Sequence, residues 1–97
     1  MSKAETNRKK LLAMLTWGKT LVVPGAHDPI SAKVVEGAGF PAVYIGSYAT
    51  AAAGFGMPDV GLVTMAEMVA HANRIADAVD VPVIADAENG WNNAANI

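Results

Sequence analysis

Two carboxylates follow an apolar run near the end of the sequence, in the stretch VPVIADAENG at residues 81–90. Asp86 and Glu88 are two positions apart, so on an extended chain their side chains project to the same side, with Cα atoms about 7 Å apart. A hard divalent cation suits two carboxylates at this spacing, and Mg²⁺ is favoured because no histidine or cysteine is nearby. The pair is therefore a candidate metal site.

The same pair has a simpler interpretation that spacing alone does not exclude. Asp86 and Glu88 could cap a following helix and face solvent, while Asn89 and Gly90 form a tight turn. A β-hairpin at Asn89 and Gly90 is disfavoured, because the residues that follow lack the alternating pattern of a return strand. Two acids by themselves leave both interpretations open.

A second polar segment, YIGSYATAAAGFGMPDVG, spans residues 44–61. Its glycines and Ser47 could present backbone N–H groups and a hydroxyl to a carboxylate or phosphate. It lacks the lysine of a phosphate-binding loop and the spacing of a dinucleotide-binding motif, so the glycines could equally serve tight turns and close packing. Asp59 is the only charge in the segment, and a turn role for it is the default.

The two histidines are weaker candidates. His27 precedes a predicted helix N-cap, where a polar residue needs no catalytic role. His71 is expected on the solvent-facing side of its helix, together with Glu67 and Arg74. Both tryptophans and most methionines are interpreted as packing residues.

Alternating predicted strands and helices position these residues. Apolar, β-branched runs predict buried strands at 20–26, 42–47 and 81–87, and capping residues with helical periodicity predict helices at 2–18, 28–39 and 64–79. This order predicts right-handed crossovers and a parallel sheet, in which functional groups gather at the carboxyl ends of the strands. Three strands that are apolar on both faces suggest the opening portion of a larger α/β protein.

Composition narrows the class of protein. The 97 residues include no cysteine, 53% are hydrophobic, and seven Lys and Arg stand against nine Asp and Glu. We therefore expect one soluble cytoplasmic domain that has no disulfide scaffold and binds no nucleic acid. The uncharged stretch 37–58 contains five glycines and two prolines, which argues against a membrane span.

Four ordered motifs carry a resemblance to a known family. They are PGAHD at 24–28, GFPAVY at 39–44, PDVG at 58–61 and PVIADAENG at 82–90. From about Leu21 to its end, the chain resembles the isocitrate lyase and phosphoenolpyruvate mutase superfamily. The resemblance implies a (β/α)₈ TIM barrel of the phosphoenolpyruvate/pyruvate type. Residues 1–97 would be the N-terminal portion of that single domain, comprising an N-terminal helix and the first three βα units.

The resemblance also implies roles for individual residues. Asp86 and Glu88 match the family's pair of acids that bind Mg²⁺, or Mn²⁺ in its place. Asp59 matches the loop aspartate that approaches the metal through water and the reacting substrate. The segment that binds the substrate carboxylate corresponds to Tyr44, Gly46, Ser47 and Tyr48.

This chain departs from the family pattern at two positions. Glu88 stands where an aspartate is common, and it is longer by one methylene. Gly46 and Ser47 reverse the common Ser-Gly order, which moves the hydroxyl by one position and across the strand. Both changes affect the expected position of the metal or the substrate.

The implied activity is that of a Mg²⁺-dependent lyase. It would cleave a C–C bond of a small branched 2-hydroxy di- or tricarboxylate, of the methylisocitrate or 2,3-dimethylmalate type, to a 2-oxo acid or pyruvate and a second carboxylate. One alternative is a phosphonomutase or P–C bond hydrolase acting on a phosphonopyruvate-type substrate. Another is an inactive truncated module, and the 97 residues by themselves are expected to turn over nothing. The family also implies a homo-oligomer, often a tetramer.

Overall fold

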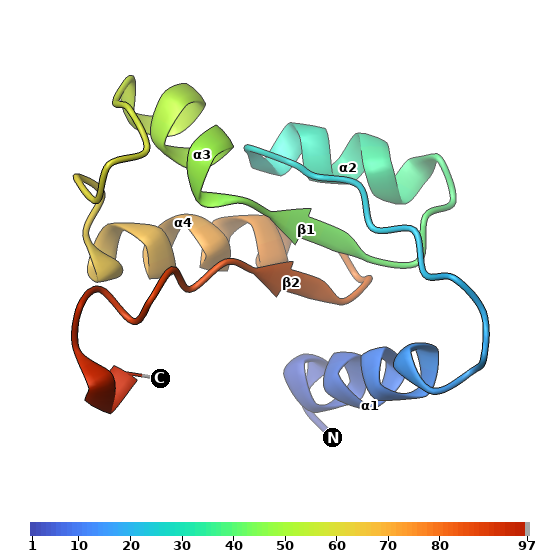
Figure 1. Ribbon diagram of the computed structural model, residues 1–97. Helices are drawn as coiled ribbons and strands as arrows, with labels where there is room; N and C mark the ends of the chain where they lie inside the picture. The colour runs from blue at the N-terminus through green and yellow to red at the C-terminus, as the bar shows by residue number, and fades with distance from the viewer. Residues whose placement is uncertain (97) are drawn as a thin grey trace.

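A short parallel sheet forms the centre of the protein (Figure 1). The computed structural model describes residues 1–96. Strands β1 (Val43–Ile45) and β2 (Val83–Ala85) pair in parallel, with Val43 opposite Val83 and Ile45 opposite Ala85. Parallel neighbours joined through a helix are what the sequence predicted, and both strands lie within their predicted ranges.

The predicted strand at 20–26 is much shorter than expected. It contributes one parallel bridge, between Gly25 and Tyr44, flanked by hydrogen bonds from Ala26 N to Tyr44 O at 2.8 Å and from Tyr44 N to Pro24 O at 2.9 Å. Proline has no N–H to donate, so Pro24 limits the ladder at this point. The segment still lies beside β1, which gives the spatial order 24–26, β1, β2.

Helix α1 (Lys3–Leu15) lies at the amino end of β2. Its N-cap residue Ser2 accepts a hydrogen bond from Glu5 N, which is one of the two bonds of the capping box that the sequence suggests at Ser2 and Glu5. Asn7 Nδ2 donates to Val81 O at 3.5 Å, and Lys3 Nζ donates to Ala76 O at 3.0 Å. None of the residues of α1 is buried, and these hydrogen bonds connect the helix to α4 (Met65–Ala78) and to the segment before β2.

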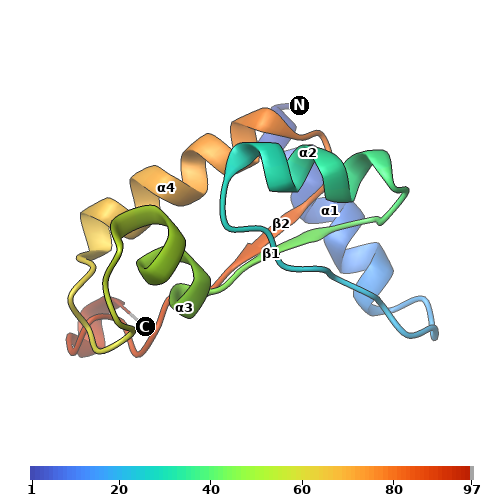
Figure 2. The ribbon, with the colours of Figure 1, turned by 90° about the horizontal axis from the view of Figure 1, so that it is seen from above.

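Helices α2 (Pro29–Gly37) and α4 (Met65–Ala78) pack side by side against the sheet (Figure 2). Asp28 caps α2, and Thr64 forms a complete capping box with Glu67 at the start of α4, both as predicted. Gly39 follows α2 with φ +92°, a conformation that glycine adopts without strain.

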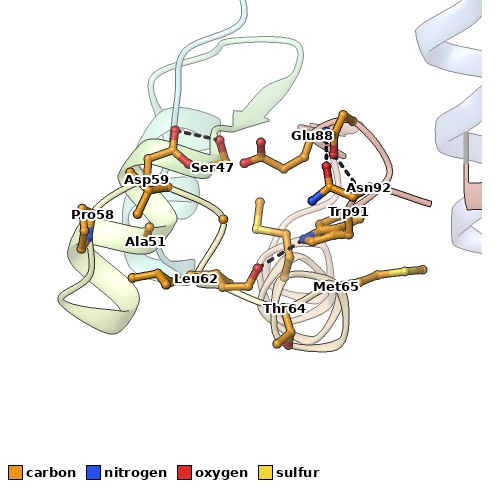
Figure 3. A pocket seen from close by; sticks show the side chains of 15 residues that line it. Ser47, Ala51, Pro58, Asp59, Leu62, Thr64, Met65, Glu88, Trp91 and Asn92 are labelled. Carbon is orange, nitrogen blue, oxygen red and sulfur yellow. Dashed lines mark hydrogen bonds between the residues drawn. The ribbon is translucent and has the colours of Figure 1, made fainter. Parts of the chain in front are cut away.

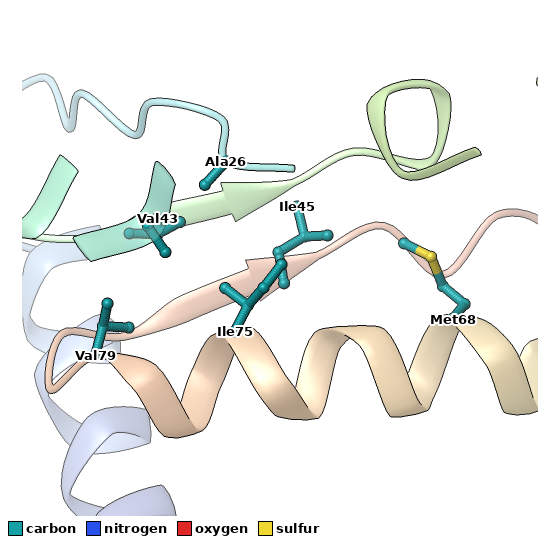
Figure 4. Packing of buried hydrophobic residues seen from close by; sticks show 7 residues of the cluster. Ala26, Val43, Ile45, Met68, Ile75 and Val79 are labelled. Atoms are coloured by element: carbon teal, nitrogen blue, oxygen red, sulfur yellow. The ribbon is translucent and has the colours of Figure 1, made fainter. Parts of the chain in front are cut away.

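The apolar core lies between β1 and the two helices. Val43 and Ile45 are fully buried and pack with Ile75 of α4 and with Val79, the residue that follows this helix (Figure 4). Ala32 of α2 is also fully buried, and its small side chain allows α2 to approach the sheet closely. Burying a side chain such as Ile75 contributes about 2 kcal/mol. Tyr44, which alternates with Val43 and Ile45, is 38% exposed on the other face of the sheet.

The segment after β1 is helical, although its glycines had suggested tight turns. A single helical turn, α3 (Ser47–Ala49), continues as the π-helix η1 (Thr50–Gly54). The run of alanines accounts for this helix formation. Thr50 Oγ1 donates to Gly46 O at 2.8 Å and anchors the turn to the end of β1. A short 3₁₀ helix, η2 (Ala94–Asn96), closes the described chain.

His71 is buried, so the prediction that it faces solvent was wrong. It is 9% exposed, and its Nε2 lies 2.8 Å from His27 O. His71 belongs to the same helical stripe as Met68 and Ile75, three positions before it and four after it, and this stripe faces the core. No helix among residues 1–96 is long and apolar enough to cross a bilayer.

Candidate active site

Three segments meet at the carboxyl end of the sheet. Ser47 begins α3 directly after β1, Asp86 follows β2, and Asp59 lies in the connection to α4. Asp86 N donates to Ile45 O at 2.9 Å, which continues the ladder one residue beyond β2 and brings Asp86 beside the end of β1. Neighbouring parallel strands end at the same edge, so the chain direction itself gathers these side chains.

The Ser47 hydroxyl lies between two carboxylates. Its Oγ is 3.1 Å from Asp86 Oδ2 and 3.3 Å from Asp59 Oδ2. A serine hydroxyl has one proton, so it can donate to only one of these carboxylates at a time, and an ionised carboxylate donates none. The arrangement therefore has more acceptors than donors, and a positive charge placed there would be stabilised.

The second oxygen of Asp86 shapes the chain that follows. Asp86 Oδ1 accepts a hydrogen bond from Glu88 N at 2.6 Å, and Gly90 N donates to Ala87 O at 3.0 Å, so residues 86–90 form consecutive turns. Glu88 has a left-handed backbone, with φ +53°. The extended-chain argument for the Asp86 and Glu88 side chains was therefore wrong, because β2 ends at Ala85. The turn that the alternative interpretation placed at Asn89 and Gly90 is present, with Glu88 and Asn89 at its centre.

Glu88 is exposed and lies at the same site as Ser47, but it is positioned by a turn and not by an extended strand. Its side chain extends from the end of the β2 segment toward Ser47 (Figure 3). Glu88, Ser47 and Asp59 all line one cavity of about 530 Å³. Two acids, Asp59 and Glu88, and the Ser47 hydroxyl therefore line one concave surface, and Asp86 lies within hydrogen-bond distance of that hydroxyl. Such an arrangement is expected for a site that binds a small polar molecule.

The remainder of this cavity is lined mainly by apolar residues, which had been interpreted as packing residues or had not been identified from the sequence. They include Leu62, Val63, Met68 and Trp91. Trp91 Nε1 donates to Val63 O at 3.3 Å, which ties the turns after β2 to the segment before α4. The sequence signal for this contact was a tryptophan directly after a polar turn, because the indole N–H of a packed tryptophan needs a hydrogen-bond acceptor.

The other predicted substrate-binding residues lie around the end of β1. Tyr44 points from the open face of the sheet, and its ring packs over Gly46, where an added Cβ would lie 3.3 Å from Tyr44 Cε1. Tyr48 on α3 is 72% exposed. Within residues 1–96, the structure brings Ser47 to the cavity but does not bring Tyr44, Gly46 or Tyr48 to its lining.

The donor chemistry of this site fits a hard cation. In the described part of the chain, no group of three or more histidine, cysteine or acidic side chains is arranged to hold a metal ion. Mg²⁺, however, is usually held by one or two carboxylates together with water and substrate oxygens. Asp86 and Glu88 can supply two carboxylates, and the excess of acceptors around Ser47 supports binding of a positive ion.

Asp28 marks the third segment end at this edge, after residues 24–26. The side chain and backbone N–H of Ser31 donate to its carboxylate and lower the pKa of Asp28 below the ordinary 3.8, with a smaller effect from His27. The backbone bond is 2.7 Å long, and His27 Nε2 lies 3.3 Å from Asp28 Oδ2. This carboxylate is already paired, so it serves as the cap of α2.

Comparison with known proteins supports an enzymatic site. The model of the phosphoenolpyruvate phosphomutase family matches residues 11–97. The chain is 52% identical over 88 residues to 2,3-dimethylmalate lyase of Eubacterium barkeri, an alignment that covers 91% of this chain and 30% of that enzyme. It is 45% identical over 78 residues to the chloroplastic carboxyvinyl-carboxyphosphonate phosphorylmutase of Arabidopsis thaliana, covering 79% of this chain and 23% of that protein.

A solved structure of similar fold carries ligands. Phosphonopyruvate hydrolase in complex with oxalate and Mg²⁺ superimposes with a TM-score of 0.82 at 33% identity, over 99% of this chain and 32% of the hydrolase. The chain thus spans about a third or less of the length of these relatives. Its helices and parallel strands have the arrangement of the corresponding part of their (β/α)₈ barrel.

Proposed function

Because the chain belongs to the phosphoenolpyruvate phosphomutase family, within the isocitrate lyase and phosphoenolpyruvate mutase superfamily, we propose that it forms part of a Mg²⁺-dependent C–C lyase. The substrate is a small branched 2-hydroxy di- or tricarboxylate of the methylisocitrate or 2,3-dimethylmalate type. The products are a 2-oxo acid or pyruvate and a second carboxylate. Residues 1–97 contribute the N-terminal portion of one barrel domain.

The observation that carries this proposal is the meeting of Ser47, Asp59 and Asp86 at the carboxyl end of the sheet. In parallel barrels this end holds the catalytic groups. The 52% identity with a dimethylmalate lyase favours the lyase reaction over others of the superfamily.

Asp86 and Glu88 are the proposed ligands of Mg²⁺, or of Mn²⁺ in its place, directly or through water. Asp59 faces the same cavity and orients water and the reacting substrate. A bound ion would supply Lewis-acid stabilisation of the C2 alkoxide and of the enolate-like carboxylate that takes the electron pair of the broken C–C bond. The carboxylates fix where that charge is stabilised.

The substrate carboxylate is proposed to bind at the end of β1. Gly46 and the first turn of α3 present backbone there, and Ser47 presents its hydroxyl. Tyr44 and Tyr48 flank this position with exposed phenol groups that can donate hydrogen bonds to a carboxylate. The apolar lining of the cavity, including Leu62 and Trp91, suits the alkyl branch of such a substrate.

A phosphonomutase or P–C bond hydrolase is the second candidate. It is supported by the 45% identity with the Arabidopsis phosphorylmutase and by the similarity to phosphonopyruvate hydrolase. Both candidates use a metal and an α-oxycarboxylic acid, so the carboxylates at the site serve either reaction. The two differ in the bond that breaks, and therefore in the product.

A substrate panel separates these candidates. The enzyme that contains residues 1–97 is incubated with Mg²⁺ and 2,3-dimethylmalate, methylisocitrate or phosphonopyruvate, and products are followed by ¹H and ³¹P NMR. Pyruvate and propionate from 2,3-dimethylmalate are the expected result. Phosphate or phosphoenolpyruvate from phosphonopyruvate, without lyase products, would establish the second candidate instead.

Matched variants test the site within the same assay. Glu88→Gln is expected to lower kcat/KM by about 100-fold, which corresponds to roughly 2.7 kcal/mol of transition-state stabilisation. Asp77→Asn changes an exposed acid of α4 away from the cavity and should leave the rate unchanged. Unaltered activity of Glu88→Gln would remove Glu88 from the proposed metal site.

Two wider features complete the proposal. The family resemblance supports a homo-oligomer, often a tetramer, and a cytoplasmic enzyme that acts on small carboxylates. Light scattering after size-exclusion chromatography gives the number of copies directly.

A further inference from the structure

We propose that Ser47 is a positioning residue, whose hydroxyl ties the segment carrying Asp59 to the end of β1, beside Asp86 at the end of β2. The inference deepens the proposed function, since the site it organises is the one assigned to the metal and substrate. It gives Ser47 a role beyond contact with the substrate carboxylate.

The hydroxyl connects parts of the chain that are far apart in sequence. Asp59 is 12 residues from Ser47 and Asp86 is 39 residues from it, yet both carboxylates lie within 3.3 Å of one oxygen. The 55–63 segment, which carries Asp59, also has backbone bonds to η1, from Gly56 N to Ala52 O and from Met57 N to Ala51 O. These bonds fix the start of the segment but not the position of the Asp59 side chain relative to β2.

Electrostatic repulsion among the acids opposes this arrangement, and the Ser47 hydroxyl offsets part of it. Asp59, Asp86 and Glu88 all carry negative charge when ionised, so their mutual repulsion opposes closure of the 55–63 segment over the site. Ser47 supplies a neutral group between Asp59 and Asp86 that can donate to either of them. A bound cation would act in the same direction, so the hydroxyl and the ion should stabilise the same arrangement.

The local structure also accounts for the position of the hydroxyl at 47 rather than 46. A Cβ at position 46 would lie 3.3 Å from Tyr44 Cε1, so a side chain there would require the Tyr44 ring to shift by a few tenths of an ångström. Position 47 is the first residue of α3, where the chain turns away from the strand. The Gly46-Ser47 order thus combines a tyrosine packed over the strand end with a hydroxyl directed at both acids.

Hydrogen exchange measured by mass spectrometry tests the inference without any assay of activity. Ser47→Ala should accelerate exchange in residues 55–63 by about fivefold, as expected for the loss of one hydrogen bond. Ser47→Thr keeps the hydroxyl and should restore slow exchange. Ser2→Ala removes a serine hydroxyl at the other end of the sheet and should leave this segment unchanged. Equal exchange of the segment in Ser47→Ala and Ser2→Ala would overturn the inference.

Trp91 provides a second readout because its indole is bonded to Val63 in the same segment. In a Trp17→Phe background, titration with Mg²⁺ should change Trp91 emission, with an apparent affinity about fivefold weaker in Ser47→Ala and restored in Ser47→Thr. Metal binding that is unaffected by Ser47→Ala, with unchanged exchange, contradicts the inference and leaves the proposed function standing. Accelerated exchange in Ser47→Ala without metal binding to the wild type supports the bridge and contradicts the proposed function.

Discussion

The two ends of the parallel sheet satisfy their polar groups in opposite ways. At the amino end, Glu36 Oε2 accepts hydrogen bonds from Asp80 N at 2.6 Å and Val81 N at 3.1 Å, and Asn7 donates to Val81 O. Each acceptor there faces a donor. At the carboxyl end, one hydroxyl of Ser47 faces two carboxylates, and a third carboxylate lines the same cavity.

This difference separates polar residues that stabilise the fold from those available to a ligand. The Glu36 oxygen that accepts two backbone N–H groups has its acceptor capacity used in the folded chain. Asp86 Oδ1 also accepts a backbone N–H, from Glu88, but Asp86 Oδ2 and Asp59 Oδ2 share one hydroxyl donor and keep acceptor capacity for a cation. At the carboxyl end, three residues other than glycine have a left-handed backbone conformation, namely Glu88, Trp91 and Asn92. Non-glycine residues in this conformation are uncommon and concentrate at functional sites.

The largest effect on stability is expected at the amino end. Glu36→Ala leaves two backbone N–H groups without their acceptor and should lower the free energy of unfolding by about 2 kcal/mol. Glu36→Gln keeps a neutral acceptor and should lose less. Chemical denaturation of the protein measures both.

Glu5→Ala is the matched control for Glu36→Ala, because the Glu5 carboxylate is exposed on α1. It should change stability by a few tenths of a kcal/mol at most. A loss in Glu36→Ala no greater than in the control would mean that the amino end is not held by this carboxylate, and the contrast between the two ends would fail.

A smaller effect is expected at Asp28, whose carboxylate at the carboxyl end accepts a hydrogen bond from Ser31 N and caps α2. Ser31 lowers the pKa of Asp28 below 3.8, so the folded state favours the ionised form. Its contribution to stability is therefore present above the unfolded pKa and is lost as pH falls through the lower folded value. Thermal unfolding should show this loss below about pH 4.

Asp28→Asn isolates the charge, since asparagine also caps helices but does not ionise in this range. The wild type should be the more stable of the two near neutral pH, and the difference should shrink on acidification. A difference that stays constant down to about pH 2 would show that Asp28 is not stabilised as a carboxylate.

Local sequence signals predicted the features that depend on neighbouring residues. The caps at Asp28 and Thr64 and the left-handed Gly39 are decided within one helical turn, so residue types alone identify them. The parallel sheet followed from the alternation of strands and helices. The acids at 86 and 88 were placed at a strand end for the same reason.

Features that depend on tertiary contacts were less accessible to prediction. The meeting of Ser47 with Asp59 and Asp86 requires the register of β1 on β2 and the path of the segment between them. The burial of His71 requires its carbonyl partner at His27, 44 residues away. The sequence predicted a longer strand before Pro24 and extended chain at Glu88, where the structure has a single bridge and a turn. A hydrophobic pattern does not show where a strand loses the N–H donors that it needs for pairing.

The central claim is that the acids at the carboxyl end bind a divalent cation, and calorimetric titration tests it most directly. Titrating Mn²⁺ or Mg²⁺ into the protein should give a binding isotherm that Asp86→Asn weakens by about 100-fold, while Asp77→Asn binds as the wild type does. Equal affinity in Asp86→Asn and wild type, or no binding to either in the presence of oxalate as a substrate-like ligand, would contradict the account.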